Sequence, residues 1–297
     1  MKVDREYAKG GLKFDVDKEL TQSLGNFRKA LKKRFPGSSG RRSMVYFLHR
    51  GVIVPNRPFV MRGEEADHIV RSRRTKRNEL IHVQDSAYRR YGARVVGIAK
   101  HGIELLAERE LPSIPESHFE ISLFQALTKE KALDNIIQKT TELGVSSIFL
   151  FCSGYSQAPK KGSDLSKRLS RWKRIAQEAC KQSDRAKPPP IDYLGRSVDF
   201  AKKMGQADSS GFPLLLLDRS GPPLGEIELE APKGCGIVIG PEGGWRGEEI
   251  DCERRIKVSV GRRTLRADTA AIVATGILQY LYGDLRSSIQ SPQLAQE

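Results

Sequence analysis

The sequence lacks the features that mark several other classes of protein. Its four cysteines are scattered without CxxC spacing, which argues against a zinc site or a disulfide framework and indicates a reducing compartment. No apolar run approaches the roughly 18 residues that a membrane-spanning helix needs. The N-terminus has no apolar core of the kind that marks a signal peptide. We therefore expect a cytoplasmic protein with no metal and no membrane contact.

Histidine is also scarce. The chain has five histidines, and none lies between Lys129 and Glu297. A Ser-His-Asp or Cys-His enzyme would have to take its histidine from the N-terminal half. This distribution counts against a hydrolase.

What the chain does have is positive charge, with a net value of +15. Residues 1–50 carry 13 Lys or Arg against five Asp or Glu, and residues 70–94 carry eight against two. Residues 95–297 carry 28 against 26 and are nearly neutral. A basic excess confined to the first third is typical of a site for a polyanion. The alternative is a basic face that is merely solvated.

The length of 297 residues allows two ordinary domains. Residues 1–43 are polar and basic and read as an extension. Residues 44–112 hold short runs rich in β-branched residues, which predict a small β-barrel. Its expected strands are Tyr46–Leu48, Leu80–Gln84, Gly92–Ala99 and Ile103–Ala107, with a helix starting near Gly63.

From Phe119 onward, strand and helix patterns alternate, which predicts a parallel α/β sheet covered on both faces. A helix over Lys131–Leu143 is expected to end at Gly144, and a second amphipathic helix spans Leu165 to Ala179. The expected strands are Phe119–Gln125, Ser147–Phe151, Leu214–Leu217, Gly236–Ile239 and Lys257–Val260.

Two stretches near the C-terminus are the most informative. Gly236–Gly247 is a buried strand followed by a glycine-rich loop, and Gly261–Ala271 is a loop before an apolar helix that starts near Thr269. Ligands of open α/β sheets sit at the carboxyl ends of strands. The loop at Gly240–Gly244 is either a tight turn or a ligand loop. Glu242 disfavours phosphate and favours a ligand with positive charge or hydrogen-bond donors.

Four segments together resemble one family. They are Ile239–Gly244, Val260–Ala270, Gln138–Val145 and Glu178–Arg185, in the family's order and spacing. The family is RsmE, the 16S ribosomal RNA uridine-N3 methyltransferases of the SPOUT class, and the likeness runs from about Met44 to Arg286. It implies a SPOUT trefoil-knotted parallel-sheet domain over 116–288, preceded by a PUA-like β-barrel over 44–112, with a tail at 289–297.

The resemblance also implies S-adenosylmethionine as cofactor, held in the knot loops mainly through backbone groups. The corresponding residues are Leu217, Gly240, Pro241, Glu242, Gly243, Gly244, Leu265 and Thr269. Core packing is the alternative role for Leu217 and Leu265. Trp245, next to the glycines, would stack on a flipped base or pack against a partner subunit.

For catalysis, methylation at N3 requires loss of the uracil proton and stabilisation of the resulting anion. We expect Arg266 to orient and stabilise the anion, and Glu242, Asp268 or solvent to accept the proton. An ordinary surface role for Arg266 and a helix N-cap role for Asp268 are the alternatives. The family normally has Glu at position 268, and Asp has a shorter reach.

The segment His68–Arg74 resembles a segment of the family's barrel, although Ser72 and Arg73 replace the usual apolar pair. The RNA-backbone candidates are Arg57, Arg71, Arg73, Arg74, Lys76, Arg77 and Arg185. The expected function is methylation of small-subunit ribosomal RNA by a homodimer. Two alternatives remain: a SPOUT enzyme that acts on a ribose 2′-oxygen or on transfer RNA, and a non-catalytic ribosome-assembly factor. Residues 1–43 would be an RNA-binding arm, a targeting segment or a misassigned start.

Overall fold

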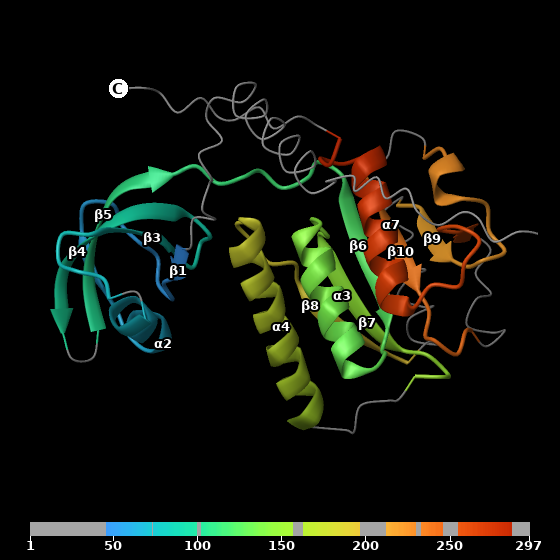
Figure 1. Cartoon of the computed structure of the whole chain (residues 1–297), viewed down its shortest axis with the longest axis horizontal. Helices are drawn as coiled ribbons and strands as arrows, with labels where there is room; N and C mark the ends of the chain where they lie inside the picture. Colours follow the sequence, from blue (N-terminus) through green and yellow to red (C-terminus); the bar gives the residue numbers. More distant parts are fainter. Residues whose placement is uncertain are drawn as a thin grey trace, which may run out of the picture. The chain divides into compact units, whose positions relative to one another are not determined.

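A computed structural model describes residues 46–72, 74–99, 102–156, 163–196, 212–229, 233–245 and 255–286 (Figure 1). The predicted extension at 1–43 lies outside these ranges. Residues 43–297 form one compact unit that contains two separate β-sheets. None of the described helices is long and apolar enough to cross a membrane.

The N-terminal sheet has five strands in the order β1-β3-β4-β5-β2. β1 runs parallel to β3, and the other pairs are antiparallel. Between β2 and β3 the chain forms the short helix α2 (Glu64–Asp67) and a π-helical turn (His68–Ser72). The strands are β1 (Tyr46–Leu48), β2 (Pro58–Met61), β3 (Leu80–Gln84), β4 (Arg90–Ala99) and β5 (Gly102–Leu111).

Alternating side chains of these strands build their own core. Val83, Tyr91, Val95 and Leu105 are fully buried there, together with Ile69 from the π-helical turn. Burial of one face of each strand favours β-branched side chains, which explains why short runs rich in such residues located four of the strands. β2 was missed because it begins with a proline and alternates only weakly in burial.

The C-terminal sheet is wholly parallel and has six strands in the order β11-β9-β10-β6-β7-β8. This confirms the predicted α/β class with a parallel sheet. The strands are β6 (Glu120–Ala126), β7 (Ser147–Cys152), β8 (Ile191–Arg196), β9 (Leu214–Leu217), β10 (Gly234–Ile239) and β11 (Arg255–Val258). β8 was not predicted, and β11 begins two residues earlier than expected.

Three helices cross one face of this sheet side by side: α3 (Glu130–Glu142), α4 (Ser163–Ser183) and α7 (Ala267–Leu281) (Figure 1). Their apolar faces share a core with alternate strand residues, and its largest side chain, Trp172, is fully buried. Gly144 ends α3 with φ +85°, as predicted, because a left-handed residue closes the last turn.

The opposite face of the sheet carries a second apolar cluster, which includes Phe124, Phe151, Leu216 and Val238. The prediction placed helices over both faces. Within the described ranges, all three of these helices pack on the first face, and none contributes to the second cluster.

Candidate functional site

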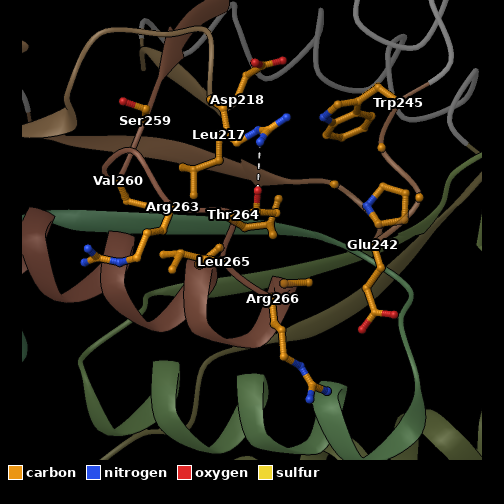
Figure 2. A pocket seen from close by; sticks show the side chains of 18 of the residues that line it. Leu217, Asp218, Glu242, Trp245, Ser259, Val260, Arg263, Thr264, Leu265 and Arg266 are labelled. Atoms are coloured by element: carbon orange, nitrogen blue, oxygen red, sulfur yellow. Dashed lines mark hydrogen bonds between the residues drawn. The ribbon is translucent and has the colours of Figure 1, made fainter.

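Three loops meet at the carboxyl edge of the C-terminal sheet. β11, β9 and β10 are adjacent and parallel, so the chain leaves all three strands at the same edge. The loops enclose an open cavity of about 890 Å³, shown in Figure 2. It is lined by Lys129, Leu217–Arg219, Ile239–Trp245, Val258–Gly261 and Arg263–Ala267, with Ala270.

Part of the cavity wall is apolar. Leu217, Val260 and Leu265 line it. Leu217 ends β9, whereas Val260 and Leu265 belong to the loop between β11 and α7, and Figure 2 shows the three side chains close together. Leu217 and Val260 also pack against the helix-side core, so they serve both the core and the cavity. Such a surface suits a flat or aliphatic part of a ligand.

The glycine-rich loop fits closely around Trp245. A Cβ at Gly240 would lie 2.7 Å from the Trp245 ring, so only glycine avoids a clash there. Trp245 in turn stacks on Phe151, with ring centroids 6.0 Å apart and planes 9° from parallel. Gly244 has φ +79°, where a side chain would be strained. Trp245 therefore packs within its own chain, and the loop has a defined shape.

Hydrogen bonds connect the other two loops. Arg219 Nη1 donates to Thr264 Oγ1 at 2.9 Å, and the Asp218 amide donates to the Val258 carbonyl at 2.9 Å. The Asp218 carboxylate accepts bonds from the backbone N and Oγ of Ser220, both at 2.8 Å. These bonds hold the pKa of Asp218 below its usual value. The Asp218 carboxylate therefore stabilises the turn at Ser220, and we do not assign it the role of proton acceptor in catalysis.

Charged side chains from different loops also line the cavity. Glu242 and Arg266 line it, and Figure 2 shows both side chains extending in the same direction. The Arg266 side chain is 71% exposed, and its Nε lies 3.6 Å from Asp268 Oδ1. Lys129, just before α3, lines the cavity as well.

The structure brings together seven of the eight predicted cofactor residues. The exception is Thr269, which lies in the first turn of α7, outside the cavity lining. Asp268 is also outside the lining. The N-cap of α7 is Arg266, so the N-cap alternative for Asp268 is wrong. Asp268 lies inside the first turn, where its charge favours the positive end of the helix, and its Oδ1 accepts from the Thr269 amide at 2.9 Å.

Most of the predicted RNA-binding side chains are on the surface of the N-terminal sheet unit. Arg57, Arg71, Arg74, Lys76 and Arg77 are exposed. Arg71 makes only a long contact of 3.9 Å with Asp67. Arg73 lies outside the described residues.

Arg185 lies in a different environment. Its side chain is only 11% exposed. The guanidinium donates to Glu116 at 2.6 Å, to the Thr141 carbonyl at 2.7 Å and to the Val145 carbonyl at 3.1 Å. These partners occupy it, which does not fit the predicted contact with RNA phosphate, and we leave Arg185 out of the RNA surface proposed below.

Sequence reasoning missed Lys129 in the cavity. It follows the carboxyl end of β6, which lies beside β10. Applying the strand-end rule to every strand, and not only to the last three, identifies it.

The described residues contain no group of three or more His, Cys, Asp or Glu that could hold a metal ion.

The model of the RNA methyltransferase domain family matches residues 115–279. Ribosomal RNA small subunit methyltransferase E of Buchnera aphidicola is 24% identical over 234 residues, 78% of this chain and 91% of its own length. The Aquifex aeolicus protein of the same name is 32% identical over 59% of this chain and 73% of its length.

Among solved structures, the fold matches ribosomal RNA small subunit methyltransferase E of Neisseria gonorrhoeae bound to S-adenosylmethionine. The TM-score is 0.69 at 29% identity, covering 82% of this chain and 99% of that one. The family model matches more than half of the chain, and the relatives are covered over most of their length. The chain therefore belongs to the ribosomal RNA small subunit methyltransferase E family of RNA methyltransferases.

Proposed function

We propose that this protein transfers the methyl group of S-adenosylmethionine to N3 of a uridine in 16S, small-subunit ribosomal RNA. The observation that carries the proposal is the three-loop cavity at the carboxyl edge of the parallel sheet. Membership of the family and the relative crystallised with S-adenosylmethionine support it.

The cavity suits this cofactor on physical grounds. Gly240, Gly243 and Gly244 leave backbone groups open to a ligand. Leu217, Val260 and Leu265 offer apolar contact to an adenine ring. Glu242 offers a carboxylate to a ligand with an amino group and a sulfonium. The cofactor supplies an electrophilic methyl group, so the protein has to position the acceptor and control its proton.

We assign the acceptor side to Arg266 and Glu242. Arg266 orients the uracil and stabilises the negative charge that develops on the ring when N3 loses its proton. Glu242, from the loop after β10, accepts that proton and passes it to solvent. Asp268 acts through its ion pair with Arg266 and is a positioning residue.

The RNA is bound by exposed basic side chains of the N-terminal part of the chain, which contains the five-stranded sheet. We propose that residues 44–112 are a PUA-like barrel that contacts the RNA backbone with Arg57, Arg71, Arg73, Arg74, Lys76 and Arg77. Such contacts position the RNA without reading its sequence. An enzyme on this substrate works where ribosomes are assembled, which places it in the cytoplasm.

We also infer a SPOUT knot in residues 116–288 and a homodimer. The strand order supports the knot, because β9 lies between β10 and β11, which follow each other in the chain. The outer face of α7 supports the dimer. Thr269, Val273, Gly276 and Tyr280 recur there at helical spacing without a charge, and Tyr280 is 55% exposed.

The test is methylation of purified small-subunit ribosomal RNA with S-adenosylmethionine, followed by nuclease digestion and mass spectrometry of the nucleosides. We expect new N3-methyluridine. A 2′-O-methyl nucleoside, or methylation of transfer RNA alone, would indicate another target of the same fold. RNA binding without cofactor binding in calorimetry would instead indicate an assembly factor.

A further inference from the structure

The near-neutral charge of the C-terminal part conceals one strongly basic helix. α4 carries six Lys or Arg against two Asp or Glu. Its apolar residues, such as Trp172 and Ala176, face the core. The charges are therefore concentrated on the side of α4 that faces away from the sheet.

Lys167, Arg174 and Lys181 recur every seven residues, so they lie along one stripe of the helix. Lys167 and Arg174 are exposed, and Lys173 is exposed beside them. Seven residues of helix advance about 10 Å, so the stripe can follow an extended strand rather than bind a single group.

Three carboxylates close to this stripe form ion pairs with Arg171 or Lys181. Arg171 forms ion pairs with both Glu130 and Asp134 of α3. Glu178 lies 3.3 Å from Lys181. In the described chain, Lys167, Lys173 and Arg174 make no ion pair, so their charges are available to a partner. Asp164 is the one exposed carboxylate left on this helix.

The two ends of the stripe connect to the sites already described. At the C-terminal end, Lys181 Nζ lies 2.6 Å from Glu65 of α2, and the basic segment Arg71–Arg77 follows α2 in the chain. At the other end, α4 begins at the carboxyl edge of the sheet, as does its neighbour α3. Lys129 marks the point where α3 meets the cavity.

We propose that the exposed face of α4, formed by Lys167, Lys173 and Arg174, is a second RNA-backbone surface that guides the substrate strand towards Lys129 and the cavity. The partner chemistry is a sugar-phosphate backbone, because Lys167 and Arg174 are unpaired cations about 10 Å apart along one side of a helix and can contact separate phosphates of one strand. The inference rests on the proposed function, and it assigns part of RNA binding to the methyltransferase half of the chain.

The test compares two double variants that each remove one Lys and one Arg. Lys167→Ala/Arg174→Ala alters the α4 surface. Lys233→Ala/Arg286→Ala is the control, because both residues are exposed and lie beyond the opposite, amino edge of the sheet, before β10 and after α7. RNA affinity is measured by fluorescence anisotropy with purified small-subunit ribosomal RNA fragments over a series of salt concentrations.

We expect the α4 variant to bind RNA at least fivefold more weakly than the control. The slope of log affinity against log salt should be shallower by about 1.4, since each lost phosphate contact in a single strand contributes about 0.7. Cofactor binding and melting temperature should match the wild type. Equal affinities and slopes for the two variants would overturn the proposal.

The two possible failures are distinguishable. If the wild type methylates ribosomal RNA and the α4 variant behaves like the control, only the α4 surface is wrong. If the wild type binds RNA without methylating it and the α4 variant is still selectively weakened, the surface stands and the enzymatic function fails.

Discussion

Trp245 stacks on Phe151 across the carboxyl edge of the C-terminal sheet, with the two rings 9° from parallel. Phe151 belongs to β7, whereas Trp245 lies in the loop after β10. The contact therefore anchors the glycine-rich loop to a strand that contributes no residue to the cavity lining.

Replacing Trp245 with alanine should loosen this loop. We expect S-adenosylmethionine affinity to fall about tenfold, which corresponds to about 1.4 kcal/mol. The free energy of unfolding should fall by about 1–2 kcal/mol, less than for a fully buried tryptophan because this ring is half-buried. Calorimetry and urea denaturation measure the two effects. Trp245→Phe keeps a stacked ring and should retain most of the affinity; equal losses in both variants would contradict an anchoring role.

Gly240→Ala tests the close fit of the same loop. The new methyl group would lie 2.7 Å from the Trp245 ring, so the ring or the loop must move. We expect at least a tenfold loss of cofactor affinity and unchanged RNA affinity. Gly225→Ala is the matched control, because nothing lies within 4 Å of its Cβ position. An affinity unchanged by Gly240→Ala would show that the loop does not need its observed shape.

Arg266→Ala tests the acceptor side of the cavity. Removing a group that stabilises developing charge should lower kcat by about 10²–10³, with little change in cofactor affinity because that binding relies on other residues. Arg262→Ala removes the same charge from the same loop at an exposed position outside the cavity lining. Single-turnover methylation with saturating cofactor compares them. Similar methylation rates for the two variants would contradict a catalytic role and indicate that Arg266 is an ordinary surface residue.

The basic segment after α2 is tested by Arg74→Ala/Lys76→Ala/Arg77→Ala. All three side chains are exposed. The slope of log RNA affinity against log salt should become shallower by about 2, at about 0.7 for each phosphate contact. Cofactor binding should be unaffected. An unchanged slope would show that these three residues do not contact the RNA backbone.

Arg185→Ala separates a structural role from RNA binding. The variant removes hydrogen bonds to Glu116 and to two carbonyl oxygens near the end of α3. We expect a loss of about 2–4 kcal/mol in the free energy of unfolding, measured in urea, with an unchanged salt slope for RNA binding. Arg185→Lys keeps the charge but not the planar fork, so it should rescue only part of the stability. A shallower slope at wild-type stability would restore the RNA-contact interpretation.

The sequence located the cavity because strand-end loops and glycines are local features. Leu214–Leu217 and Tyr46–Leu48 were predicted to the residue, and each is a short apolar run that ends just before a polar residue, Asp218 or His49. β8 was missed because its burial is irregular, with one buried residue in Ile191–Arg196, so it lacks a periodic signal.

The role of Arg185 was beyond sequence reasoning for another reason. Its partners Glu116, Thr141 and Val145 lie 40 to 69 residues away in the chain, and two of them are backbone carbonyls that carry no sequence signal. Lys129 shows the opposite case. A general rule about strand ends would have found it. What the sequence did not reveal is that β6, the strand before Lys129, pairs with β10.

The strand order of the C-terminal sheet has a consequence for synthesis on the ribosome. The N-terminal sheet is complete once Leu111 has emerged, whereas the cavity also needs β11 and the first turn of α7. At translation rates of about 5–20 residues per second, this interval is on the order of 10 s. A nascent chain therefore presents its basic N-terminal surface well before it can hold a methyl donor. During that time it can associate with RNA but cannot modify it.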